Sequence, residues 1–276
     1  MSTQLVPANH YTVEQLAEIY NRTRVDYLVP MPMSADRLAE YIQDFDIDLN
    51  KSVVALLDEE IAGLGMLGLR KKRAWITRLG VLPQNRRVGI GEMIFEKMLE
   101  NARVEGIAQV YLEVIKGNER ARALFKKHGF LDNGECLVFR RAPGRPESLP
   151  SGDITLMEKE QALDCLRSAR SQTWINQPES MSNAAEVFGM SLMLQDGSYG
   201  WIIFRKKIPT LSHVIMHTWQ GDPVVVGKEL LNRLHILYPR LDTYAENIYS
   251  DDPHIPAYLS LGYFEAFRRT EMIAEL

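Results

Sequence analysis

The sequence predicts an α/β protein built from two domains in tandem, each a mixed, mostly antiparallel sheet flanked by helices. Strand-like and helix-like segments alternate along the chain, one proline- and glycine-rich stretch divides it, and the halves share short motifs in the same order. With 276 residues, of which 46% are hydrophobic and 25% charged, the chain is long enough for two domains of average size.

The elements of the first half follow from capping residues and apolar periodicity. Thr12 and Ser34 are placed to cap helices over 12–24 and 34–45. Strands are expected near 52–58 and 61–69, and "AWITRLGVL" continues the sheet. A glycine loop, a helix to about Arg103 stopped by Gly106, strand "QVYLEV", helix "ERARALFKKH" stopped by Gly129 and a last strand complete this half.

The linker is "RRAPGRPESLPSGD", Arg140 to Asp153, in which three prolines and two glycines lie between two strand-like segments. We therefore expect a first domain over 1–142, a linker over 143–152 and a second domain over 153–276.

The two halves echo each other. "QVYLEVIKGNE" (109–119) aligns without a gap with "DTYAENIYSDD" (242–252), and "HGF" and "LGY" follow at the same offset. "GLRKK" (68–72) and "IFRKK" (203–207) each close an apolar strand-like run. Because these pairs occur in the same order, the sequence predicts a diverged tandem repeat.

Composition excludes several classes of protein. A formal net charge of -4 and a pI near 5.9 argue against a protein that binds nucleic acid or an anionic membrane through its overall charge. The sequence has no leader-like start and no apolar run long enough to span a membrane. Its two cysteines, Cys136 and Cys165, are too few for a disulfide framework. We therefore expect a cytoplasmic protein in which both cysteines are buried. His213 and His217, four residues apart in a strand, would lie roughly 13 Å apart, too far to share a metal, and we expect no metal site.

The loop in "VLPQNRRVGIGEMIF" carries Arg86, Gly89 and Gly91 as R-x-x-G-x-G between a strand and a helix. Backbone N–H groups of such a loop and the positive end of the helix can hold a phosphate, to which Arg86 and Arg87 could add hydrogen bonds. Alternatively, the glycines only allow close packing and the arginines are solvated. The motif is neither a Rossmann nor a P-loop fingerprint.

Together with "LEVIKGNERARALFKKHGF" about thirty residues on, this stretch resembles the GNAT superfamily of N-acetyltransferases, over most of residues 1–142. The resemblance implies acetyl-CoA as co-substrate, with its pyrophosphate on the Arg86–Gly91 loop and its pantetheine arm along the splayed strand ending "RLGV", in contact with Asn118. The cofactor-binding residues implied are Leu79, Val81, Arg86, Arg87, Val88, Gly89, Ile90, Gly91, Asn118 and Phe125.

Attack on a thioester needs a neutral amine, so a base must take its proton. Glu113 is the candidate, because it lies in an apolar strand where desolvation should raise its pKa, and it matches the base of ribosomal-protein-alanine acetyltransferases, which the "LEV" and "GN" spacing resembles. The alternative is a structural carboxylate. The backbone N–H of Val81, in the Leu79–Val81 segment where the family's strand bulges, is the expected oxyanion donor.

Two departures from the family pattern matter. Phe125 lies where members often carry a tyrosine that protonates the leaving thiolate. In the second half, Glu246 is in register with Glu113 and Tyr258 with Phe125, but the glycine loop is missing: Asp222 lies near Gly227 instead, and an acidic residue repels phosphate. We expect a degenerate copy that binds no CoA, with Tyr258 as a core aromatic.

The acceptor is left open between a small molecule and a peptide amine. Asp44, Asp46 and Asp48 could draw a cationic amine, although a solvated loop is the simpler interpretation. The predicted function is N-acetyl transfer to a primary amine by direct attack in a ternary complex; the alternatives are a protein N-terminal acetyltransferase and a CoA-binding regulatory or scaffold protein. A homodimer is also left open.

Overall fold

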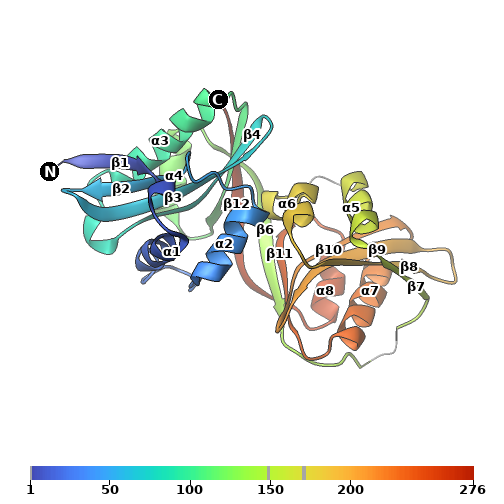
Figure 1. Ribbon diagram of the computed structural model, residues 1–276. Coiled ribbons are helices and arrows are strands. Elements are labelled where there is room, and N and C mark those ends of the chain that lie inside the picture. Colours follow the sequence, from blue (N-terminus) through green and yellow to red (C-terminus); the bar gives the residue numbers. More distant parts are fainter. Residues whose placement is uncertain (1, 148–149, 170–171) are drawn as a thin grey trace. The chain divides into compact units, whose positions relative to one another are not determined.

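A computed structural model describes residues 2–147, 150–169 and 172–276, and the chain forms two compact units (Figure 1). Unit 1 comprises the residues up to Asn133 together with Thr270–Leu276, and unit 2 comprises Gly134–Arg269. These units differ from the expected segments 1–142 and 153–276, because the chain passes from one unit to the other inside two strands, after Asn133 in β6 and after Arg269 in β12. Residues 148–149 of the predicted linker lie outside the described residues.

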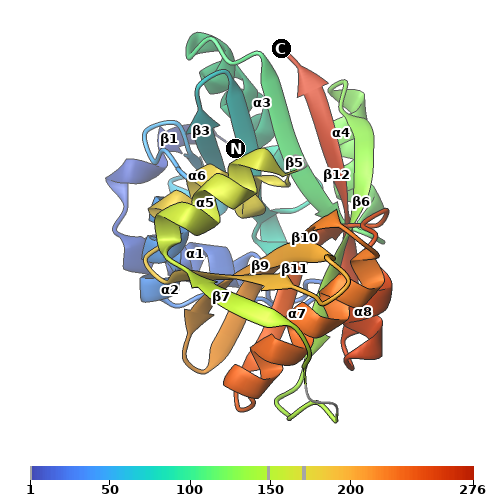
Figure 2. The ribbon, with the colours of Figure 1, turned by 90° about the vertical axis from the view of Figure 1, so that its right-hand side faces the viewer.

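The sheet of unit 1 has the strand order β1-β2-β3-β4-β5-β12. Neighbours from β1 to β4 are antiparallel, whereas β4 and β5 are parallel. The end of β12 lies beside β5 (Figure 2), where Leu276 N–H donates to Ala108 O at 3.0 Å. The strands are β1 Thr3–Pro7, β2 Val53–Leu57, β3 Glu60–Arg70, β4 Arg73–Val81, β5 Gln109–Ile115, β6 Leu131–Arg141 and β12 Phe264–Glu275, of which β6 and β12 continue into unit 2.

The predicted helices of this unit are confirmed. Thr12 caps α1 in a capping box with Gln15, and the Ser34 side chain caps α2. Helices α3 and α4 pack on one face of the sheet through the core around Phe95, whereas α2 covers the other face, where Tyr41 lies against Trp75 (Figure 1). The helices are α1 Val13–Arg22, α2 Ala35–Asp44, α3 Ile90–Val104 and α4 Glu119–Lys127, with 3-10 turns at Ala8–His10 and Pro83–Asn85.

Unit 2 has the strand order β12-β6-β11-β10-β9-β8-β7. Helices α7 and α8 pack on one face against Leu211 and Val214, and α5 and α6 pack on the other against Trp201 and Ile203 (Figure 1). The elements are β7 Asp153–Met157, α5 Lys159–Ser168, a 3-10 turn at Trp174–Asn176, α6 Pro178–Asn183, β8 Val187–Met193, β9 Tyr199–Lys207, β10 Thr210–Gln220, α7 Pro223–Leu237, β11 Asp242–Tyr249 and α8 Ile255–Ser260.

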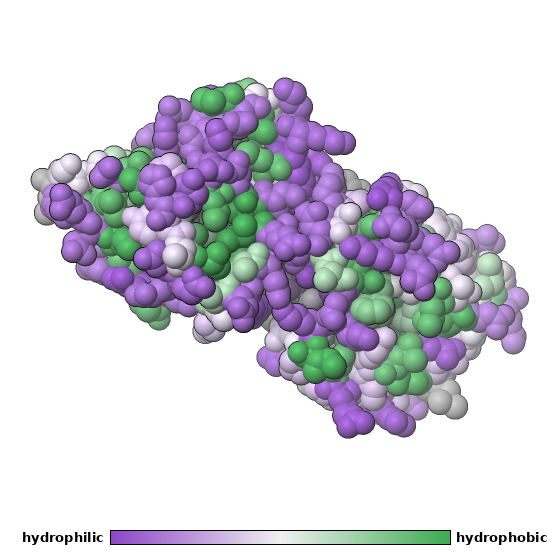
Figure 3. All heavy atoms as spheres, viewed as in Figure 1, coloured by the Kyte–Doolittle hydropathy of each residue, from purple (hydrophilic) through white to green (hydrophobic). Residues whose placement is uncertain are grey.

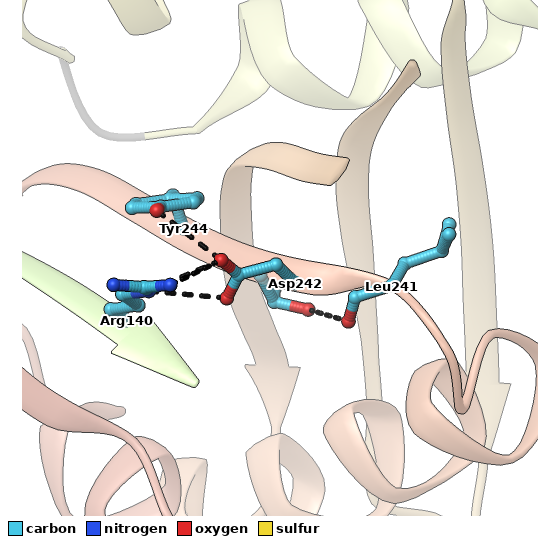
Figure 4. A network of polar contacts seen from close by, with 5 residues as sticks. Arg140, Leu241, Asp242 and Tyr244 are labelled. Atoms are coloured by element: carbon cyan, nitrogen blue, oxygen red, sulfur yellow. Dashed lines mark hydrogen bonds and ion pairs between the residues drawn. The ribbon is translucent and has the colours of Figure 1, made fainter. Parts of the chain in front are cut away.

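Strands β6 and β11 are joined by a polar network as well as by backbone pairing (Figure 4). The Arg140 guanidinium on β6 donates to both carboxylate oxygens of Asp242 on β11, at 3.2 and 2.7 Å, and Tyr244 O–H donates to the same carboxylate. This bidentate ion pair adds a side-chain contact to the backbone pairing of β6 and β11.

The echoing motifs form the same local structure. "HGF" and "LGY" both end a helix: Gly129 and Gly262 are left-handed, at φ 84° and 82°. In each case the next residue donates its N–H to the carbonyl five positions earlier, Phe130 to Phe125 at 3.1 Å and Tyr263 to Tyr258 at 3.2 Å. The two segments therefore share one capping geometry, and their origin by duplication stays a prediction.

The face seen in Figure 3 is mostly hydrophilic, with hydrophobic residues in smaller patches. Within the described residues, no helix combines the length and the apolar character needed to cross a membrane. Cys136 is buried as expected, whereas Cys165 is only partly buried.

Candidate active site

Strands β4 and β5 separate partway along their length. Their pairing runs from Arg73–Gln109 to Ile76–Leu112, and both strands continue past the last pair. At this point β4 also bulges against β3: the register shifts between the pairs Leu64–Gly80 and Met66–Thr77, and Arg78 adopts a φ of 55°. The predicted bulge is thus present: between these two pairs β4 has Arg78 and Leu79 where β3 has only Gly65, so the bulge reaches the first residue of the Leu79–Val81 segment.

The start of α3 lies at the same end of β4. Gly89 is its N-cap, at φ 88°, and no side chain caps the helix. The first N–H groups of a helix have no partner within the helix, so these donors are available to an anion. A Cβ on Gly89 would meet no atom within 4 Å, so space is open beside this backbone. Val88 and Arg87 are exposed, whereas Ile90 is buried in the core.

Arg86 is engaged by other groups of the protein. Its Nη1 and Nη2 bind both carboxylate oxygens of Asp26, at 2.6 and 2.7 Å, and its other donors reach the carbonyls of Val81 and Thr23. The Arg86 guanidinium holds the pKa of Asp26 below its usual range, through the hydrogen bonds first and the charge second. Arg86 therefore fastens the loop after α1 to the end of β4. Arg87, at φ 69°, remains the exposed arginine of the motif.

Asn118 lies where β5 ends and α4 begins. Its Oδ1 caps α4 by accepting from Ala121 N–H at 3.3 Å, and its Nδ2 is 3.5 Å from the Tyr27 hydroxyl. Phe125, in contrast, points into the core: its side chain is buried, and its ring lies 5.0 Å from that of Phe95 and 6.3 Å from that of Phe130. The family motif thus places Asn118 at the splay and Phe125 beneath it.

Glu113 lies just beyond the last β4–β5 pair. Its Oε2 accepts from the indole Nε1–H of Trp75 at 2.8 Å, which orients the carboxylate. On the same face, the Tyr41 hydroxyl is 2.7 Å from Thr77 Oγ1, and burial raises the pKa of Tyr41 to about 12. The Arg78 guanidinium lies 4.2 Å from the centre of the Tyr41 ring. This face of the splay is therefore aromatic, with one carboxylate and one guanidinium.

The acidic stretch after α2 is engaged in structure. Asp46 pairs with Arg70 at 2.6 Å, Asp48 accepts from Asn50 N–H at 2.8 Å, and Asp44 is buried. Among the described residues, Glu92, Glu96 and His128 form a group that could hold a metal ion, but Lys127 and His128 already bind Glu92 Oε1, at 2.6 and 2.9 Å. Ion pairing accounts for this group.

Unit 2 fills the equivalent positions with its own side chains. Asp222 caps α7 by accepting from Val224 N–H at 2.8 Å, and Pro223 begins the helix. His254, before α8, bridges to β10: its Nε2 is 2.9 Å from Thr218 Oγ1 and its Nδ1 is 2.8 Å from Asp252 Oδ1. Tyr258 is a core aromatic, as predicted, and its hydroxyl donates to Val214 O at 2.9 Å.

Sequence reasoning missed the loop between α1 and α2, from which Arg24, Asp26 and Tyr27 reach the site. The Arg24 guanidinium lies 4.0 Å from the centre of the Tyr27 ring, and its Nη2 donates to Leu79 O at 3.0 Å. The contact between Arg24 and Leu79 joins residues 55 positions apart, so no local sequence pattern indicates it. Trp75, Tyr41 and Arg78 were also missed, although an indole three positions before Arg78, in the strand expected to bulge, was a usable signal.

Comparison with known proteins agrees with this architecture. The sequence model of the acetyltransferase (GNAT) family matches residues 13–130. A GCN5-related N-acetyltransferase from Sphaerobacter thermophilus superposes with a TM-score of 0.68 at 15% identity, covering 99% of this chain and 95% of that one. A tandem GNAT protein from the clavulanic acid biosynthesis pathway, solved without AcCoA, gives 0.66 at 15% identity, covering 99% and 98%.

A GCN5-related N-acetyltransferase from Anabaena variabilis gives a TM-score of 0.59 at 12% identity, covering 99% of this chain and 72% of that one. At these identities the solved structures establish the fold, which extends over both units. Among curated protein sequences, none matches the chain. Residues 13–130 of the chain thus match the acetyltransferase (GNAT) family, whose general chemistry is acetyl transfer, and the solved structures show that the fold of such proteins extends over the whole chain.

Proposed function

We propose that this protein transfers acetyl from acetyl-CoA to a primary amine, by direct attack of the amine on the thioester. The observation that carries the proposal is the junction of two features at one end of β4: the strands β4 and β5 part after Ile76–Leu112, and α3 begins at Gly89 without a side-chain cap. The parted strands expose backbone groups along which the extended pantetheine arm could lie, and the start of α3 offers N–H donors to the pyrophosphate.

The donor is proposed to bind in unit 1 alone. Its pyrophosphate would lie on the backbone of Val88–Gly91 beside the exposed Arg87, while Arg86 supports the loop from below through Asp26, Thr23 and Val81. The pantetheine arm would lie between Leu79–Val81 and Asn118. In unit 2, Asp222 lies at the start of α7 and His254 at the start of α8, so we propose that this unit binds no CoA.

Glu113 is proposed to take the proton of the attacking amine, directly or through water. Its carboxylate is held by Trp75 at the mouth of the splay, within the aromatic face formed by Tyr41 and Trp75. An oriented acceptor at this position is what general base catalysis requires. The backbone N–H of Val81 is proposed to stabilise the oxyanion. No covalent enzyme intermediate is required.

The acceptor is proposed to be a small molecule or a peptide amine. Asp44, Asp46 and Asp48 offer little attraction to a cationic acceptor, because Asp46 is paired with Arg70 and Asp44 is buried. A protein N-terminal acetyltransferase is the alternative acceptor class. A CoA-binding scaffold with weak catalysis is the alternative from another class, favoured by the burial of Phe125 in place of an acid.

The test has two steps with the full chain. Acetyl-CoA is titrated calorimetrically, with one site per chain expected; thiol release is then followed with amines, aminoglycosides and peptides. Turnover with any acceptor supports the enzyme. Tight binding without turnover across the panel favours the scaffold, and absence of binding refutes the donor site.

A further inference from the structure

Cleavage of a thioester leaves a thiolate, which must gain a proton to leave as a thiol. A thiol has a pKa of about 8.5, so the thiolate departs unaided, but a positioned acid typically adds about 10²- to 10⁴-fold. Phe125 has no hydroxyl, and its burial against Phe95 and Phe130 keeps it out of the splay. Another group is therefore needed if unit 1 is to supply this proton.

Tyr27 lies at the right place. It is half-buried in the loop between α1 and α2, and its hydroxyl is 3.5 Å from Nδ2 of Asn118, the residue at the end of β5. The neighbouring Leu28 approaches the same connection: a Cβ on Gly117 would meet Leu28 Cδ1 at 4.0 Å. The loop thus brings a phenol over the junction of β5 and α4.

The polarity of the contact with Asn118 decides what the phenol can do. Oδ1 of Asn118 accepts from Ala121 N–H at 3.3 Å, so the amide group that faces Tyr27 is the NH₂. An NH₂ group can only donate, and the phenol oxygen therefore accepts. The hydrogen of the Tyr27 hydroxyl is then directed elsewhere and can be donated to a ligand between the strands.

Two residues just before Tyr27 hold the loop. Asp26 forms the bidentate ion pair with Arg86, which in turn binds Val81 O at 3.1 Å. The Arg24 guanidinium stacks on the Tyr27 ring at 4.0 Å and donates to Leu79 O at 3.0 Å. Tyr27 is thus tied to the end of β4 while its hydroxyl reaches the end of β5, the two walls of the proposed donor site.

We propose that Tyr27 is the general acid of this acetyltransferase, in place of the residue that Phe125 replaces. The inference rests on the proposed function for the course of the donor between the two strands. As the amine nitrogen bonds to the acetyl carbon and the C–S bond breaks, the sulfur takes its proton from the Tyr27 hydroxyl. The phenolate then recovers a proton from solvent, to which the proton taken by Glu113 is returned, so the products are an N-acetyl amine and a free thiol.

The experiment is Tyr27→Phe in the full chain, which removes one oxygen and keeps the ring under Arg24. We expect kcat to fall by about 100-fold while the calorimetric Kd for acetyl-CoA stays within a factor of two. The matched control is Tyr111→Phe, which removes a hydroxyl from β5 that bonds only to Gln109 Oε1, at 3.0 Å, among the described hydrogen bonds. That control should keep the kcat of the wild-type chain.

An unchanged kcat in the Tyr27→Phe variant would overturn the assignment, whether or not the Kd for acetyl-CoA is weakened. A phenol that only binds the donor is not its acid. This result is separable from failure of the proposed function. If the wild-type chain binds no acetyl-CoA or turns over no acceptor, the enzyme itself is refuted; if it turns over and the variant equals it, only the acid is.

Discussion

Helices α3 and α7 are both fifteen residues long and follow a strand that runs parallel to its neighbour, yet they begin in opposite ways. α3 starts at Gly89 with no side-chain cap, whereas α7 starts at Asp222, whose carboxylate accepts from Val224 N–H at 2.8 Å, followed by Pro223. A proline at the first position has no N–H to offer, and the carboxylate occupies the positive end of the helix. The start of α3 can bind an anion from outside the protein, whereas the start of α7 already holds the carboxylate of Asp222.

The comparison indicates that the residue at the N-terminus of this helix decides whether the helix start can bind an anion. A side-chain cap stabilises the free protein, and its removal leaves donors that only water or a ligand satisfies. The next helices differ in another way: Asn118 caps α4 and keeps its NH₂ group toward Tyr27, whereas His254 does not cap α8 and bridges to Thr218. We therefore expect unit 1 to be the stronger binder and unit 2 the better satisfied at these positions.

The largest expected effect comes from giving α3 the start of α7. Gly89→Asp should abolish acetyl-CoA binding in calorimetry, because the carboxylate would lie among the N–H groups proposed for the pyrophosphate. Gly89→Asn separates charge from strain, since asparagine tolerates a positive φ and carries no charge. It should retain measurable binding. If Asp and Asn weaken binding equally, strain at φ 88° and not charge explains the loss.

The reverse exchange sharpens the same comparison. Asp222→Gly should create no second acetyl-CoA site, because Pro223 and the His254–Thr218 bridge remain. Two sites per chain in this variant would show that the cap alone had closed unit 2.

The next largest effect concerns the two carboxylates in register, Glu113 and Glu246. Glu113→Gln should lower kcat/KM by about 10²- to 10⁴-fold and flatten its decline on the acid side, because the amide cannot accept the proton of the amine. Glu246→Gln is the matched control in unit 2 and should leave the initial rate of thiol release unchanged. Equal rates for both variants would assign Glu113 to the structural role that its bond with Trp75 also permits.

A third contrast is in the response to acid. Burial lowers the pKa of His213 to about 4 and that of His235 to about 3, and both belong to unit 2. Each histidine is neutral in the folded chain and gains a proton on unfolding below its ordinary pKa near 6.5. The stability present above pH 6.5 is therefore lost as pH falls toward 4, by about 1.4 kcal/mol per pH unit for each histidine.

Urea unfolding between pH 4.5 and 6.5 tests this slope. Tryptophan fluorescence reports mainly on unit 2, which holds Trp174, Trp201 and Trp219, whereas unit 1 holds Trp75. His235→Gln should reduce the slope by about 1.4 kcal/mol per pH unit, whatever it does to stability at pH 7. An unchanged slope would mean that carboxylates alone account for the loss of stability in acid.

The sequence predicted those features of the fold that depend on residues adjacent in the chain, and it did not predict those that depend on contacts between distant residues. Thr12 and Ser34 were identified as caps because a cap and its helix are adjacent, and Gly89 stood out for the same reason. Strand β1 was missed, since "TQLVP" is too short to show alternation. The passage of β6 and β12 between units depends on strand pairing across more than a hundred residues, which no composition shift records.

The site divides in the same way. Asn118 and Glu113 came from a motif, but the loop carrying Arg24, Asp26 and Tyr27 meets β4 and α4 only in three dimensions. Phe125 came from the same motif, but its burial in the core depends on its packing against Phe95 and Phe130, which the motif does not record. The positive φ of Arg78 was equally invisible, since any sequence around a bulge reads as a strand.

The smallest expected effect is on the stability of the capped helix. Asp222→Ala should cost about 1 kcal/mol in the free energy of unfolding of unit 2, because Val224 N–H loses its partner at a helix start. Asp222→Ser keeps an acceptor without the charge and should restore most of that loss in urea unfolding followed by tryptophan fluorescence. If Asp222→Ser loses as much unfolding free energy as Asp222→Ala, the charge of the aspartate stabilises α7, and the hydrogen bond does not. If alanine costs nothing, the cap of α7 confers no stability that α3 lacks, and the distinction between a satisfied and an open helix start would have to rest on ligand binding alone.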